Sequence, residues 1–172
     1  MSLRALVLVL LLSSCARAPA PGPPPDDWPT PPPDATRARV LHVTDGDTVV
    51  LSGLSVGRVH RRTGGRSVRL IGVDTPERDD CYGLRATGFT GARLSGRRVR
   101  VGFDVQPTDR YGRALVYLWT EDGRLFNADL VAEGYAVPLT IPPNVAHADL
   151  FARLSREARG ADRGLWRACG NG

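Results

Sequence analysis

An acid-rich corner follows a short alternating segment near the middle of the chain. Residues 68–78 read Val-Arg-Leu-Ile-Gly-Val-Asp-Thr-Pro-Glu-Arg, which brings Asp74, Thr75 and Glu77 into four positions. The proline between the last two fixes its own φ and keeps the preceding residue extended, so the strand ends there with its acids close together. Arg69 lies on the same strand. Phosphate chemistry requires an acid that binds a hard cation, a second acid that can accept a proton, and a guanidinium fork. A solvated strand end is the alternative interpretation.

Two more segments carry acids or arginines on predicted turns. The run Thr44-Asp45-Gly46-Asp47-Thr48 separates two β-branched stretches, which is a strong hairpin signal. Asp45 is expected to be a turn residue, whereas Asp47 starts the second strand and would hold its carboxylate on a fixed backbone. The run Asp109-Arg110-Tyr111-Gly112-Arg113 forms a loop between two further strands.

The periodicity of the chain predicts the elements that must position these residues. Five short strands with interleaved helices predict an α+β, mainly β fold: a five-stranded OB-type Greek-key barrel with about three packed helices. The helices are expected to begin near Tyr82, Asn127 and Asn144, the last two acting as caps. The expected strands are 37–43, 49–51, 68–73, 98–103 and 114–119, and the expected helices are 82–94, 127–133 and 144–158.

Length and composition fit a single domain with a core. The chain has 172 residues, 42% of them hydrophobic, and a formal net charge of +5, with every one of its 23 basic residues an arginine. Arginine forks suit phosphate, and the basic surface is compatible with a polyanion, although genome composition alone also produces such a bias. The G-x-S-x-G pattern at residues 53–57 is followed by no helical period, which argues against an esterase.

The first 34 residues resemble an export leader and a linker. Residues 1–15 combine Arg4 with a short apolar run that ends in Leu-Ser-Ser-Cys, which resembles a bacterial lipobox with Cys15 as the lipidated residue. A plain secretory signal is the alternative. Residues 16–34 are rich in proline and predict an extended linker, or less readily a ligand for a proline-binding domain. The folded domain is then expected over 35–172, lipid-anchored in the cell envelope or secreted, and monomeric.

Two cysteines remain after Cys15. Cys81 and Cys169 are 88 positions apart and fit no zinc spacing. Leftover cysteines in an exported protein most often pair, so a disulfide is expected, with two free thiols as the alternative.

Three separated segments together resemble the thermonuclease (staphylococcal nuclease-like) family. They are Asp45-Gly46-Asp47-Thr48, Arg69-Leu70-Ile71-Gly72-Val73-Asp74-Thr75-Pro76-Glu77 and Asp109-Arg110-Tyr111-Gly112-Arg113. The similarity covers roughly residues 37–167. It implies an OB-type barrel and a calcium-dependent phosphodiesterase acting on DNA and RNA, with products that end in a 3′-phosphate.

The resemblance also implies a role for each matching residue. The calcium ligands would be the side chains of Asp47 and Asp74 and the backbone carbonyl of Thr75. Glu77 would orient or deprotonate the attacking water. The scissile phosphate would be held by Arg69 and Arg113, with Tyr111 beside it.

The chain also departs from the family pattern. Leu139 and Ile141 stand where the family prototype has tyrosines for base stacking, which affects substrate affinity rather than phosphate chemistry. The leading expectation is therefore an exported calcium-dependent endonuclease. A nucleic-acid or protein binding module without activity is the alternative, and the complete set of acids and arginines favours the enzyme.

Overall fold

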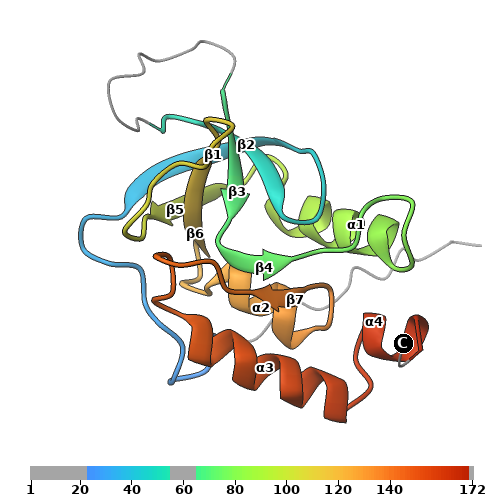
Figure 1. Cartoon of the computed structure of the whole chain (residues 1–172). Coiled ribbons are helices and arrows are strands. Elements are labelled where there is room, and N and C mark those ends of the chain that lie inside the picture. Colours follow the sequence, from blue (N-terminus) through green and yellow to red (C-terminus); the bar gives the residue numbers. More distant parts are fainter. Residues whose placement is uncertain (1–22, 55–64, 171–172) are drawn as a thin grey trace, which may run out of the picture.

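Five strands close into a barrel in the computed structural model of the chain, which describes residues 23–54 and 65–170 (Figure 1). The expectation of a mainly β, OB-type barrel with packed helices is confirmed. In chain order the elements are β1 (Thr36–Val43), β2 (Thr48–Ser52), β3 (Arg66–Leu70), β4 (Gly72–Asp74), α1 (Gly83–Leu94), β5 (Arg98–Gly102), β6 (Ala114–Thr120), α2 (Phe126–Ala132), β7 (Val137–Leu139), α3 (Ala148–Gly160) and α4 (Leu165–Ala168).

The barrel follows the order β1-β2-β3-β6-β5 and closes through the pairing of β5 with β1. Its neighbours are antiparallel except for β3 and β6, which run parallel. Alternate side chains of each strand enter the core, as the sequence pattern predicts. Among them Val40, Val49, Val68 and Val116 are fully buried.

The expected strand 68–73 is two strands, because the chain turns at Gly72. This glycine has φ of +77°, and a Cβ placed on it would lie 2.5 Å from the ring of Phe151 in α3. The left-handed conformation and the close approach both favour glycine. β4 therefore leaves the barrel and pairs with β7 in a separate two-stranded sheet, which brings the acid corner beside that sheet (Figure 1).

α1 packs against β1 and α2 against β6, but two predicted helix caps are wrong (Figure 1). α2 is buried along its whole length and packs on α3, which places Phe151, Leu154 and Ala158 toward the core. Asn127 lies inside α2, and its amide bonds the backbone of Leu118 and Ile71. Asn127 therefore fixes the backbone of two distant segments instead of starting a helix.

The second predicted cap, Asn144, precedes α3 by four residues and bonds the backbone of a distant loop. Its side chain donates to the carbonyl of Gln106 and accepts from the N–H of the same residue, both at 2.8 Å. α3 begins only after His147, with no side-chain cap.

The proline-rich segment packs on the domain wherever the structure describes it. The segment rises from beside α3 to the start of β1, in blue in Figure 1. Trp28 is 7% exposed and belongs to the core, and Nε1 of Trp119 donates to the carbonyl of Pro29 at 2.7 Å. Residues 23–34, expected as part of an extended linker, are thus in contact with the barrel.

Cys81 and Cys169 form a disulfide, with their Cα atoms 5.8 Å apart. The bond joins the segment before α1 to the end of α4.

Within the described ranges, the structure contains no helix with the length and apolar character needed to cross a bilayer. The predicted leader and Cys15 lie outside the described residues.

Candidate functional site

Asp47 is held at the turn between β1 and β2 by a dense set of contacts. Its side chain is nearly buried, and its backbone N–H donates to the carboxylate of Asp45. The preceding Gly46 leaves room for Thr75, since a Cβ there would lie 2.6 Å from the threonine Oγ1. Thr90 of α1 donates to the carbonyl of Gly46 at 2.6 Å. The hairpin turn, the acid corner and α1 therefore meet at this point.

Arg69 connects two of the predicted site acids. Its guanidinium forms ion pairs with Asp47 through Nη1 and with Asp74 through Nη2, the second at 2.7 Å. The two carboxylates come from different strands but lie within the span of one guanidinium. A fork that binds two carboxylates at once is a favourable arrangement for arginine.

Thr75 completes the corner through its backbone and its hydroxyl. The N–H of Thr75 donates to Oδ2 of Asp47 at 2.8 Å, and its Oγ1 donates to the same oxygen at 3.0 Å. The extended backbone expected before Pro76 allows both bonds.

The electrostatic balance of Asp47 shows that its charge is only partly compensated. Burial raises the pKa of Asp47 to about 6, although Arg69 and the N–H of Thr75 act in the opposite direction. A carboxylate in this state gains from a further cation. Asp74, whose side chain is 50% exposed, offers a second hard oxygen ligand beside it.

The oxygen donors at this corner are of the kind that a hard divalent cation prefers. Two carboxylates and the backbone carbonyl of Thr75 are the kind of ligand that calcium prefers, and the remaining positions would go to water or a phosphate oxygen. Across residues 23–54 and 65–170, no three His, Cys, Asp or Glu side chains form a metal cluster. The ion would thus depend on these three oxygen donors and on ligands from outside the chain.

A cleft of about 550 Å³ lies next to the corner. Arg69 lines it from the barrel, and Tyr111 and Arg113 line it from the loop between β5 and β6. Leu139 and Ile141 form part of its apolar wall and are 39% and 61% exposed. The cleft therefore combines three guanidiniums, those of Arg69, Arg110 and Arg113, with an apolar surface.

Arg113 enters the cleft from a loop that Asp109 organises. Oδ2 of Asp109 accepts from Nε of Arg113 at 2.7 Å, while Oδ1 accepts from the backbone N–H groups of Tyr111 and Arg113, each at 2.9 Å. Burial raises the pKa of Asp109, but these hydrogen bonds outweigh it and hold that pKa below its ordinary value. The sequence motif includes Asp109, but its part in positioning Arg113 is visible only in the structure.

Tyr111 lies exposed at the rim of the same loop. Its ring is 69% exposed and lies 4.7 Å from the guanidinium carbon of Arg110 and 5.8 Å from that of Arg113. This cation–π stacking keeps the phenol beside the cleft.

Glu77 makes no hydrogen bond or ion pair with the other predicted site residues that the structure describes. Its side chain is exposed, does not line the cleft, and makes no ion pair or hydrogen bond with the described part of the chain. Its backbone is fixed, since its carbonyl accepts from the N–H of Asp80 at 2.9 Å and a Cβ on Gly83 would lie 1.7 Å from that oxygen. The carboxylate thus projects into solvent from a rigid turn, two residues after Thr75.

The structure brings most of the predicted site residues into one region. Asp47, Asp74, Thr75 and Arg69 are in direct contact, and Arg69 shares the cleft with Arg113 and Tyr111.

Comparisons with known proteins agree with this geometry. A model of the family described as "Staphylococcal nuclease homologue" matches residues 67–168. The chain is 38% identical over 133 residues to a thermonuclease of Staphylococcus intermedius, and 32% identical over 134 residues to that of Staphylococcus hyicus, with 74% of each chain covered. It is also 31% identical over 129 residues to an uncharacterized endonuclease of Escherichia coli O157:H7, covering 74% of this chain and 75% of the relative.

Proposed function

The chain belongs to the family of staphylococcal nuclease homologues and is a nuclease, and we propose that it is an exported, calcium-dependent endonuclease that cuts DNA, RNA or both and leaves 3′-phosphate ends. The observation that carries this proposal is the contact of one guanidinium with two carboxylates at the edge of a cleft. Asp47, Asp74 and Arg69 thereby form a compact charged centre from two separated segments.

Calcium at this corner would be held by Asp47, Asp74 and the carbonyl of Thr75. When bound, it would offset the charge of the phosphodiester and of the transition state. Arg69 is already within 2.7 Å of Asp74, so a phosphate that reaches the guanidinium also lies next to these acids.

The side chains of the chain itself supply the remaining chemistry. Arg69 and Arg113 would bind the non-bridging oxygens of the phosphate and stabilise their growing charge during in-line attack. Glu77 would accept the proton of the attacking water as the water oxygen bonds to phosphorus. The bond from phosphorus to the 5′ oxygen then breaks, and the leaving oxygen takes a proton to become a 5′-hydroxyl. The phosphate stays on the 3′ side.

Export is supported by the cysteine chemistry of the domain. A disulfide between Cys81 and Cys169 suits an oxidising compartment, and residues 1–15 have the pattern of a signal. We propose that Cys15 carries a lipid and that the proline-rich segment follows it. Mass spectrometry of the full-length protein tests the anchor, because an unmodified Cys15 in the mature protein excludes it.

The metal and the acid can be tested on residues 23–172. We expect EGTA to abolish cleavage of DNA and RNA, and added calcium to restore it. Glu77→Gln should lower the rate at least about 10²-fold, because it removes general-base catalysis, with no change in melting temperature since the side chain is exposed.

Asp149→Asn is a matched control, because Asp149 is also exposed but lies on α3. It should retain full activity. Normal turnover of Glu77→Gln would remove that residue from the mechanism, and activity that persists in EGTA would remove the metal.

A further inference from the structure

Four arginines face each other across two strands of the barrel, away from the cleft. Arg37 of β1 is the register partner of Arg100 of β5, and Arg39 is the partner of Arg98. Directly opposite residues in an antiparallel pair have Cβ atoms roughly 5 Å apart. The four side chains, which we call the arginine ribbon, therefore form two adjacent cross-strand pairs.

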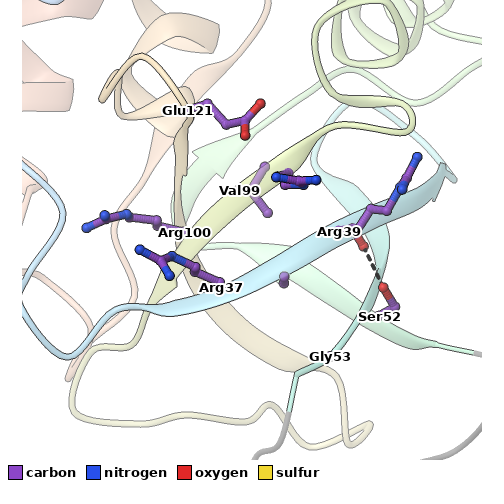
Figure 2. Close-up of a pocket in the computed structure, with 9 residues that line it drawn as sticks. Arg37, Arg39, Ser52, Gly53, Val99, Arg100 and Glu121 are labelled. Atoms are coloured by element: carbon purple, nitrogen blue, oxygen red, sulfur yellow. Dashed lines mark hydrogen bonds between the residues drawn. The ribbon is translucent and has the colours of Figure 1, made fainter.

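The alternation of both strands puts this ribbon on the outer face. Ala38 and Val99 lie between the arginines in sequence and are 8% and 2% exposed, so the arginines point to solvent. A hollow of about 590 Å³ runs over them, bounded on one side by Ser52 and Gly53. In Figure 2, Arg37 and Arg100 extend in the same direction from the two strands, and Arg39 extends the other way.

Acidic partners for the arginine ribbon are scarce. Of the described residues that line the hollow, Glu121 alone is acidic. None of the four arginines forms an ion pair with a carboxylate in residues 23–54 and 65–170. The surface therefore has a marked excess of positive charge.

Folding alone does not account for this arrangement. Like charges directly opposite each other on a sheet are destabilising. An arginine array without carboxylates gains when an anion with several charges binds, because each guanidinium can hold a phosphate through a planar fork. The exposed ribbon therefore has the character of a binding surface for a polyanion.

This surface is separate from the cleft but rigidly connected to it. The described residues that line the two hollows do not overlap. Arg37 and Arg39 belong to β1, and the turn that carries Asp47 follows the end of the same strand. A ligand on the ribbon is thus held at a fixed position relative to the catalytic corner.

We propose that the arginine ribbon is a second nucleic-acid surface, which binds the phosphate backbone of the substrate outside the cleft. The choice of ligand rests on the proposed nuclease function, whereas the binding itself does not require cleavage. A long substrate would contact both surfaces, and a dinucleotide would reach only the cleft. Contacts to the phosphate backbone carry no sequence information, so binding through the ribbon is expected to be independent of sequence.

Binding in a chelator separates this proposal from the catalytic one. Affinity for a 30-nucleotide single strand is measured in EGTA at several salt concentrations, for residues 23–172 and for Arg37→Gln/Arg100→Gln. Each lost phosphate contact should make the slope of log affinity against log salt concentration shallower by about 0.7. The slope of the double variant should therefore be shallower than the wild-type slope by about 1.4. Its melting temperature should not fall, because a like-charge pair has been removed.

Arg156→Gln/Arg167→Gln is the matched control, since both residues are exposed and the change in net charge is the same. This control should keep the wild-type slope. Equal losses in the two double variants would mean a general charge effect and would overturn the proposal.

Two further measurements distinguish the ligand. In calcium, Arg37→Gln/Arg100→Gln should lower the ratio of kcat/KM for the 30-nucleotide strand to that for a dinucleotide by at least about threefold, since each lost phosphate contact weakens binding at moderate salt. Co-sedimentation with vesicles of phosphatidylglycerol and phosphatidylcholine tests a membrane instead. Loss of vesicle binding with an unchanged salt slope for DNA would overturn the proposal.

Discussion

Arg113 reaches the cleft already oriented, because Asp109 holds both its side chain and its backbone. A guanidinium must be placed within a few tenths of an ångström to match a phosphate in its transition state. The bond from Nε leaves the terminal nitrogens of Arg113 available to a ligand, and the 2.7 Å contact is charge-assisted. Asp109 is therefore a positioning residue and not a catalytic one.

We expect Asp109→Asn to lower kcat by about tenfold, less than the loss of about 10²-fold expected for Arg113→Ala, which removes the phosphate ligand itself. The amide can still accept from the backbone N–H groups, but it no longer forms the ion pair. The kinetics of the two single variants and of Asp109→Asn/Arg113→Ala form a double-mutant cycle.

The cycle has a clear contrary outcome. If Asp109 acts through Arg113, the double variant should be no slower than Arg113→Ala. Additive losses would show that Asp109 contributes by another route.

At the scale of residues, the sequence indicates two local parts of the corner, although the contact between them joins residues 28 positions apart. The Asp-Gly turn places Asp47 directly before β2, and the proline after Thr75 fixes the end of β4. The ion pairs of Arg69 depend in addition on the register of β2 with β3, in which Thr48 is the partner of Arg69. The role of Asp109 depends on side-chain rotamers, which spacing does not define.

At the scale of elements, Asn127 joins three parts of the fold. Its side chain accepts from the N–H of Leu118 at 3.0 Å and donates to the carbonyl of Ile71 at 2.9 Å, and its amide lies 3.3 Å from the carbonyl of Val116. It is fully buried in α2. α2 is therefore fastened to β6 and to the bend between β3 and β4.

Asn127→Ala should lower the free energy of unfolding by about 2–6 kcal/mol, because it leaves a buried N–H and a buried carbonyl without partners at about 1–3 kcal/mol each. Urea denaturation monitored by circular dichroism measures the loss. Arg156→Ala, on the exposed side of α3, should change stability by less than about 0.5 kcal/mol. A loss at Asn127 as small as this would contradict the bridging role.

Asp104 connects the loop after β5 to the start of α3. Its carboxylate accepts from the backbone N–H groups of Val105 and Ala146 and from the hydroxyl of Tyr117. Burial raises the pKa of Asp104, but these hydrogen bonds outweigh it and leave that pKa below its ordinary value. The ionised form is thus stabilised in the folded state.

The sign of the pH dependence follows from that lowered pKa. The stabilisation is complete above the unfolded pKa of about 3.9 and is lost as the pH falls through the lower folded pKa. Asp104→Asn should cost about 1–2 kcal/mol at pH 7, and the difference from wild type should shrink on acidification below about pH 4. Melting temperatures from pH 3 to pH 7 test this, and a constant difference would refute it.

Periodicity predicts the barrel strands because each has a buried and an exposed face, but it does not predict where Gly72 breaks the pattern. Val68 and Leu70 alternate as expected, yet Ile71 and Val73 are buried as well, since β4 has a core contact of its own. Asn127 and Asn144 resemble helix caps in sequence. Their actual partners lie 9 to 56 positions away, which a local rule cannot detect.

At the scale of the whole molecule, the domain begins earlier than its composition indicates. Proline content predicts an extended chain, but it does not show that Trp28 contributes to the core. The ring of Trp28 lies 4.9 Å from the guanidinium of Arg124, and Arg153 of α3 forms an ion pair with Asp27. Residues 23–34 therefore stabilise the side of the barrel near β6 and α3.

Truncation tests this extended boundary. A chain that starts at residue 35 loses Trp28 and the Trp119–Pro29 hydrogen bond, so its free energy of unfolding should be much lower than that of a chain that starts at residue 23. Trp28→Ala within the longer chain isolates the core contact and should cost about 3–5 kcal/mol, as for other buried tryptophans. Denaturant unfolding of all three proteins, with the disulfide kept oxidised, gives both values. Equal stability of the two truncated chains would mean that the segment is only a linker, because a segment that packs in the core cannot be removed without loss.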